Sequence, residues 1–106
     1  MGAAYSAPVA ADLSSGTVFS RAPDILDARV GEVLVLHDPN ADSYVRLNAS
    51  AAMIWDELSH PAGLGELADA LAERGGLGAA DARSEVGRFL EELLQRGVVV
   101  RGERAE

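Results

Sequence analysis

The stretch SYVRLNASAAMIWDELSH, residues 43–60, changes its hydrophobic period in the middle and so decides the fold. In its first part, Val45 and Leu47 alternate with more polar neighbours, and this period of two is typical of a β-strand. After Asn48, a good helix N-cap, the apolar residues recur every three or four positions, as on one face of an α-helix. That apolar stripe consists of Ala51, Ile54, Trp55 and Leu58. A strand is therefore predicted to run directly into a helix.

Two further β-compatible runs precede this strand. Residues 25–30 and residues 32–37 are separated at Gly31, and the turn-forming segment DPNAD at 38–42 divides the second run from Ser43–Leu47. Neighbouring strands joined by such short connections pair antiparallel. The sequence thus predicts a three-stranded antiparallel meander.

Two more helices are predicted downstream. One begins after Gly63, has Glu66 at its third position and ends at Gly75 and Gly76. The other runs from about residue 80 to residue 96 and is closed by Gly97. Val98, Val99 and Val100 then form a short terminal strand. The predicted class is α+β, with the three-stranded sheet followed by three helices.

The length of 106 residues allows one compact domain with a modest core. Residues 1–20 are rich in Ala and Ser and show no apolar periodicity, so we expect a flexible N-terminal tail. Val18 and Phe19 are the candidates for its first ordered residues. The domain is expected to span residues 21–101, followed by a polar tail at 102–106.

Charge and composition exclude several classes of function. The net charge of −8 repels phosphate backbones, which argues against general nucleic-acid binding. No apolar run is long enough to span a membrane, and no signal peptide is visible, so a cytoplasmic location is expected. Without cysteine there is no thiolate metal site and no cysteine nucleophile, and two histidines are too few for a histidine-rich metal site.

Three motifs have a simpler structural interpretation. GLGELA at 63–68 matches a relaxed dinucleotide-binding pattern, but a helix precedes it where a strand is required, so it is interpreted as a helix start. Asp38, Asn40 and Asp42 match half of a calcium loop, but the later positions do not fit and a turn explains them. No serine lies in a nucleophile elbow. We therefore expect no enzymatic activity, no cofactor and no bound metal.

Two features are left unexplained. The apolar stripe of the third helix is wider than a surface helix needs, which fits either the central helix of a small domain or a helix that also faces a groove. Gly87 in its middle costs about 1 kcal/mol relative to Ala, which suggests close approach by a neighbouring helix or by a ligand backbone. Strand Ser43–Leu47 is an edge of the meander, and neither Pro nor Lys blocks it.

Three segments of the sequence resemble the PqqD-like family, the RiPP recognition elements. They are YVRLN running into AAMIWDEL (44–58), GELADALA (65–72) and VGRFLEELLQRG (86–97), and the resemblance covers roughly residues 21–100. It implies a winged-helix-like domain that captures the leader segment of a ribosomally made precursor peptide. In that family the leader adds as a strand to the third β-strand and lodges against the third helix. The peptide-binding residues implied here are Ser43, Tyr44, Val45, Arg46, Leu47, Arg83, Val86, Gly87, Phe89, Leu90 and Leu93.

The leading hypothesis is thus a non-catalytic adaptor that presents the leader to a modifying enzyme such as a leader peptidase, a cyclase or a radical enzyme. Family members serve lasso peptides and radical-enzyme products, among others. The alternative is a winged-helix DNA-binding regulator, which would need a basic third helix, whereas residues 80–96 hold four acidic residues and three arginines. Self-pairing through the open strand edge is a third option.

Overall fold

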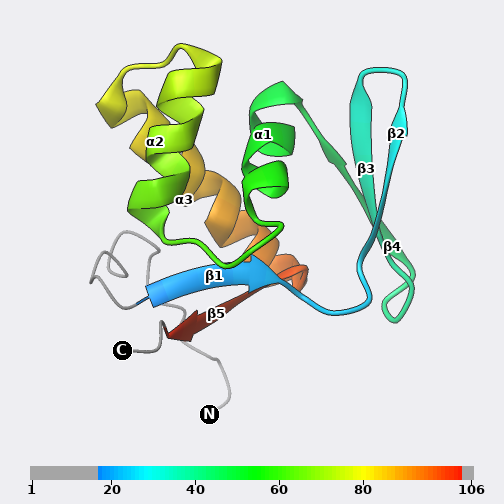
Figure 1. Cartoon of the computed structure of the whole chain (residues 1–106). Helices are drawn as coiled ribbons and strands as arrows, with labels where there is room; N and C mark the ends of the chain where they lie inside the picture. Colours follow the sequence, from blue (N-terminus) through cyan, green and yellow to red (C-terminus); the bar gives the residue numbers. More distant parts are fainter. Residues whose placement is uncertain (1–16, 104–106) are drawn as a thin grey trace.

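Two sheets and three helices make up residues 17–103, the part of the chain that the computed structural model describes (Figure 1). In chain order the elements are β1 (Thr17–Arg21), β2 (Leu26–Val30), β3 (Val33–Asp38), β4 (Ser43–Leu47), α1 (Ala49–Glu57), α2 (Leu64–Gly75), α3 (Ala79–Arg96) and β5 (Val99–Glu103). The predicted order of three strands followed by three helices is confirmed, and a second, two-stranded sheet is added to it.

The meander β2-β3-β4 is antiparallel throughout. Val30 pairs with Val33, so only two residues connect β2 to β3, and the first of them, Gly31, has the positive φ of +65° that such tight hairpin turns require. Between β3 and β4, the Asp38 carboxylate accepts the backbone N–H of Asn40 at 3.0 Å. This side-chain-to-backbone bond is that of an Asx turn, so the turn interpretation of the DPNAD segment is confirmed.

The helix ends follow from their capping residues. The Asn48 side chain accepts the N–H of Ala51 at 2.9 Å, which caps α1. At the start of α2, Glu66 reaches back and its carboxylate accepts the N–H of Gly63 at 2.7 Å. Gly97 ends α3 in the left-handed conformation, at φ +78°. Helix α3 begins at Ala79, one residue before the predicted start.

The strand pair β1–β5 corrects the expected domain boundaries. The tail was expected to extend to residue 20, but β1 begins at Thr17, and Phe19 has no exposed surface. Strand β5 extends beyond the expected boundary at residue 101, to Glu103, and pairs antiparallel with β1. Val18 and Phe19, the candidates for the first ordered residues, both lie in β1 and are buried. Their pairing could not be predicted locally, because the partner strand lies at the other end of the chain. Residues 1–16 and 104–106 of the expected tails lie outside the described residues.

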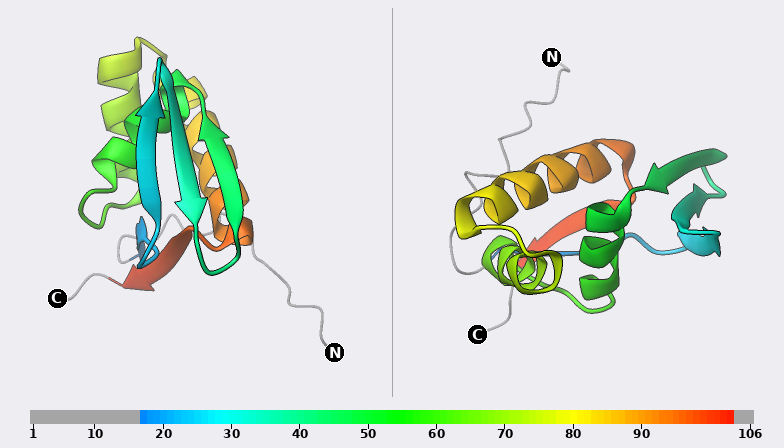
Figure 2. Two further views of the ribbon diagram at one scale, coloured as in Figure 1. Left: turned by 90° about the vertical axis from the view of Figure 1, so that its right-hand side faces the viewer. Right: turned by 90° about the horizontal axis from the view of Figure 1, so that it is seen from above.

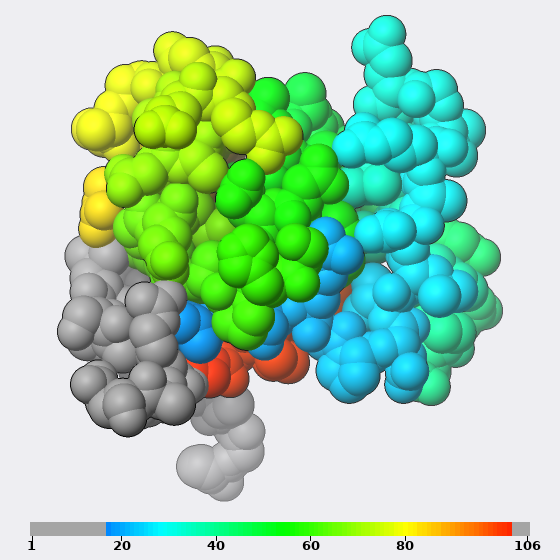
Figure 3. Space-filling view, viewed as in Figure 1, coloured from blue at the N-terminus to red at the C-terminus, as the bar shows by residue number. Residues whose placement is uncertain are grey.

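The meander stands on one side of the molecule, and α1 lies between it and the pair α2–α3 (Figures 1 and 2). Figure 3 shows the same division on the surface, with the strands of the meander set beside the helices. The inner face of β3 and β4 is apolar and buried and consists of Leu34, Leu36, Val45 and Leu47. It joins one continuous core with Ile54 and Trp55 of α1. Between residues 17 and 103, no helix has both the length and the apolar character needed to cross a membrane.

Candidate functional site

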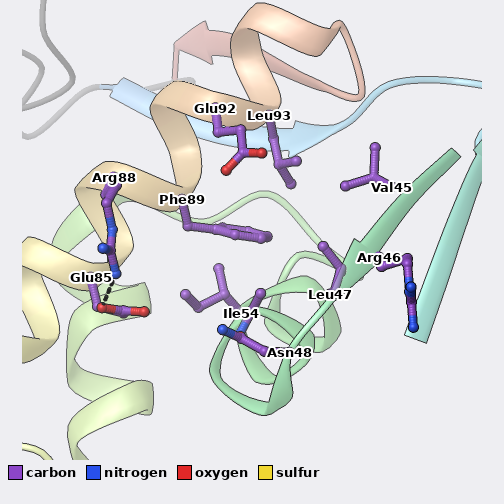
Figure 4. Close-up of a pocket in the computed structure, with 11 residues that line it drawn as sticks. Val45, Arg46, Leu47, Asn48, Ile54, Glu85, Arg88, Phe89, Glu92 and Leu93 are labelled. Atoms are coloured by element: carbon purple, nitrogen blue, oxygen red, sulfur yellow. Dashed lines mark hydrogen bonds and ion pairs between the residues drawn. The ribbon is translucent and has the colours of Figure 1, made fainter. Parts of the chain in front are cut away.

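A groove of about 280 Å³ lies between β4 and α3, with α1 at its base (Figure 4). Strand β4 contributes Val45, Arg46 and Leu47, and the strand-to-helix junction contributes Asn48. The remaining lining residues are Ala51 and Ile54 from α1, and Glu85, Arg88, Phe89, Glu92 and Leu93 from α3. Three elements that are separate in the sequence therefore build one groove.

The side chains at the back of the groove are apolar, although most of the accessible surface of its lining is polar. Val45 and Leu47 point inward because they occupy alternate positions of β4, and Ile54 faces them from α1. Phe89 and Leu93 lie one helical turn apart on α3 and close the opposite side (Figure 4). These side chains are at least nine-tenths buried in the free chain, so the groove is firmly packed from behind.

The rim of the groove carries both signs of charge. On α3, Arg88 pairs with Glu85, and Arg96 pairs with Glu92 at 3.2 Å. The Arg88 side chain is 73% exposed, and exposed pairs of this kind contribute less than about 1 kcal/mol. The rim charges can therefore exchange these partners for those of a bound molecule at little cost.

The free edge of β4 borders the groove. In the described part of the chain, β4 pairs on one side only, with β3, since the strand order is β2-β3-β4. Alternate residues of an edge strand direct backbone N–H and C=O groups away from the sheet, where another strand can pair with them. An extended segment could therefore add to the sheet here and place every second side chain in the groove.

Five of the eleven residues predicted for peptide binding line this groove, namely Val45, Arg46, Leu47, Phe89 and Leu93. Ser43 and Tyr44 belong to the same edge strand but lie outside the groove lining. The Tyr44 ring is on the outer face of the sheet, 62% exposed and stacked on His37 with 4.3 Å between ring centroids.

The other four predicted residues, all on α3, do not line the groove. Val86 and Leu90 have no exposed surface and belong to the core, so Leu90 is not on the outward flank of the helix. Arg83 is exposed away from the groove. A Cβ at Gly87 would meet nothing within 4 Å, so a closely packed neighbouring helix does not explain this glycine.

Six lining residues were missing from the predicted set: Asn48, Ala51, Ile54, Glu85, Arg88 and Glu92. A signal for two of them existed, because Glu85 and Glu92 stand four residues before and three residues after Phe89 and so share its helical face. No local signal could have identified the α1 residues, because only the tertiary packing places α1 beneath β4.

Comparisons with known proteins identify the family of the chain and two similar structures. The family model described as coenzyme PQQ synthesis protein D (PqqD) matches residues 34–99. TbiB1 in complex with the TbiA(beta) leader peptide has a similar structure, with a TM-score of 0.68 and 19% identity over 76% of this chain and 93% of that one. Lasso peptide synthetase B1 complexed with the leader peptide gives a TM-score of 0.66 and 25% identity over 77% of this chain and 96% of that one. No curated protein sequence matches the chain.

Proposed function

Because the chain belongs to the PqqD family, we propose that it is a RiPP recognition element, a non-catalytic adaptor that captures the leader segment of a ribosomally made precursor peptide. The observation that carries this proposal is the free edge of β4 beside a groove with apolar side chains at its back and charged residues at its rim. Lasso peptide synthetase B1, which shares this fold, has been solved with a leader peptide bound.

Strand addition would use both features at once. Main-chain hydrogen bonds to β4 supply affinity for any extended peptide, and the groove selects among leaders by the side chains it receives. Strand β4 has five residues, which span about 17 Å, so it accommodates two or three inward-facing leader side chains. These would be apolar, since they meet Phe89, Leu93 and Ile54. The outward-facing leader residues would continue the outer face of the sheet.

The alternative, a DNA-binding regulator, fits the structure poorly. The exposed face of α3 would have to enter the major groove, but Glu85 and Glu92 line the same side of this helix as Arg88. We further propose that the captured leader is presented to a modifying enzyme, such as a leader peptidase, a cyclase or a radical enzyme. This would occur in the cytoplasm, where precursor peptides are synthesised.

The test begins with a search of the neighbouring genes for a short precursor peptide. The ¹⁵N-labelled chain is then titrated with a synthetic leader that corresponds to the N-terminal half of that precursor. The expected result is saturable shift changes in β4, α1 and the groove side of α3, with slower amide exchange along β4. A peptide N-methylated at successive positions provides the control. Each methyl group at a position paired with β4 removes one hydrogen bond, worth about 0.5–1.5 kcal/mol, so losses should alternate along the peptide.

Two results would contradict the proposal. One is uniform sensitivity to N-methylation, which would exclude pairing with a strand edge. The other is tight, salt-resistant binding of duplex DNA without any response to the leader, which would favour the regulator.

A further inference from the structure

A polar cluster joins three parts of the fold. It lies at β2, the edge strand of the meander opposite to β4 and the groove. The indole Nε1–H of Trp55 in α1 donates to the Asp27 carboxylate of β2 at 2.8 Å. Arg21, the last residue of β1, donates to the Trp55 carbonyl at 2.6 Å and lies 3.6 Å from the Asp27 carboxylate. The Arg21 guanidinium also sits 4.4 Å from the centre of the Trp55 ring. One cluster thus connects the β1–β5 sheet, the first helix and the meander.

The inner face of β2 differs from that of β3 and β4 in its chemistry. Where β3 and β4 present buried apolar side chains, β2 presents Asp27 and Arg29. Arg29 forms a second contact with α1, an exposed ion pair with Asp56 at 3.5 Å. Strand β2, the farthest from the groove, therefore contacts α1 through hydrogen bonds and ion pairs, which depend on direction. Strands β3 and β4 pack through apolar contacts, which do not.

From this arrangement we infer that Arg21, Asp27 and Trp55 form a latch that fixes the tilt of the meander and so sets the width of the leader groove. The three strands are hydrogen-bonded into one sheet, so a rotation at β2 is transmitted to β4. Helix α1 supplies both the Trp55 end of the latch and the base of the groove, so it is the support about which the sheet would turn. This inference rests on the proposed function, and it makes the three residues positioning residues, since none of them lines the groove.

The Trp55 end of the latch is buried, whereas the Asp27 side chain at the other end is 42% exposed. Trp55 is only 1% exposed, so its indole N–H has little access to water and depends on a protein acceptor. Any tilt that separates β2 from α1 breaks this bond and the Arg21 contact with the same carboxylate. The latch therefore holds the groove in its binding geometry before the leader arrives, which reduces the cost of ordering it on binding.

The first experiment needs no peptide. The chain has no cysteine, so spin labels can be attached at Arg46→Cys on β4 and Gln95→Cys on α3, both exposed positions. With Asp27→Ala added, the distribution of distances between the labels should broaden or shift. Asp27→Asn, which keeps an oxygen acceptor for the indole, should restore much of the original distribution. The matched control is Glu57→Gln, which breaks the 2.8 Å ion pair between α1 and Arg74 of α2 without touching the sheet.

The second experiment measures affinity for the synthetic leader described above, at a temperature where circular dichroism shows every variant folded. If Asp27→Ala leaves about one molecule in ten with the sheet in its binding position, affinity falls about tenfold. Asp27→Asn should lose less, and Glu57→Gln should bind as the wild type does. A purely structural role would lower the melting temperature but leave the affinity of the folded chain unchanged.

An unchanged label distance in Asp27→Ala would overturn the latch, whatever the peptide does. A broadened distance with no leader binding in any variant, wild type included, would instead count against the proposed function alone. A broadened distance with undiminished leader affinity would show that the sheet moves but that the groove does not depend on it, which also overturns the inference.

Discussion

Phe89 and Leu90 are adjacent in α3 but lie on different faces of the helix. Phe89 lines the groove, whereas Leu90 has no exposed surface and is absent from the groove lining. A rotation of about 100° per residue separates them, so the helix divides its wide apolar surface between the groove and the core. The division explains why a stripe of this width is present on a surface helix.

Replacing Leu90 therefore tests the core and not the groove. Leu90→Ala should lower the free energy of unfolding by about 2–5 kcal/mol, because it removes a fully buried side chain and leaves a cavity. Leu90→Glu should not fold, since a carboxylate would be buried without a partner. Circular dichroism shows whether Leu90→Glu folds, and urea denaturation gives the free energy of unfolding of Leu90→Ala. A Leu90→Glu chain that is as stable as wild type would show that this residue faces outward after all.

Ala51 offers a cleaner test of the groove. It lies on α1, lines the groove and is only partly buried, so a glutamate at this position can extend into the groove without disturbing the core. Ala51→Glu should fold normally and bind the leader at least about tenfold more weakly, a loss of about 1.4 kcal/mol, because apolar leader side chains would meet a charge. Fluorescence anisotropy with a labelled leader gives the affinity.

The control for this variant is Ala80→Glu. Ala80 is exposed in the first turn of α3, outside the groove, so the same change of charge should leave binding intact. Equal losses in both variants would indicate a general electrostatic effect of the added carboxylate instead of a blocked groove.

Because β1 belongs to the second sheet, we expect substitutions of its buried residues to lower the free energy of unfolding strongly. Phe19→Ala should destabilise the fold by about 3–5 kcal/mol, because Phe19 is fully buried among core residues. Its neighbour Ser20 is only partly buried, so Ser20→Ala serves as the control and should change stability by less than about 0.5 kcal/mol. Thermal unfolding of the two variants would show whether β1 is integral to the domain; equal melting temperatures would mean that it is not.

The sequence predicted elements whose signals are local. The change of period around Asn48, the hairpin at Gly31 and the cap at Gly97 each depend on a few neighbouring residues, and all three were confirmed. The pairing of β1 with β5 could not be predicted in this way, because Phe19 meets Arg101 only after the chain has folded. The same limit explains Leu90, since periodicity groups apolar residues on a helix without saying which of them face the core.

Replacement of Gly87 within α3 and of Gly97 at its C-terminal end should change the free energy of unfolding in opposite directions. Gly97 has a φ of +78°, so Gly97→Ala forces a side chain into the left-handed region and should cost about 1–2 kcal/mol of stability. Gly87 has ordinary helical geometry and open space around it, so Gly87→Ala should stabilise the free chain by about 0.5–1 kcal/mol, through helix propensity. Urea denaturation of the two variants measures the change in the free energy of unfolding for each.

The same variant decides why a glycine stands at this position. If the bound leader approaches the helix backbone at Gly87, the added methyl group occupies that space, and Gly87→Ala will bind the leader more weakly although its fold is more stable. A stability gain with unchanged affinity would place the leader away from Gly87, along the Phe89 and Leu93 face that lines the groove. A loss of stability would instead show that a neighbour packs against Gly87, in conflict with the open space around it.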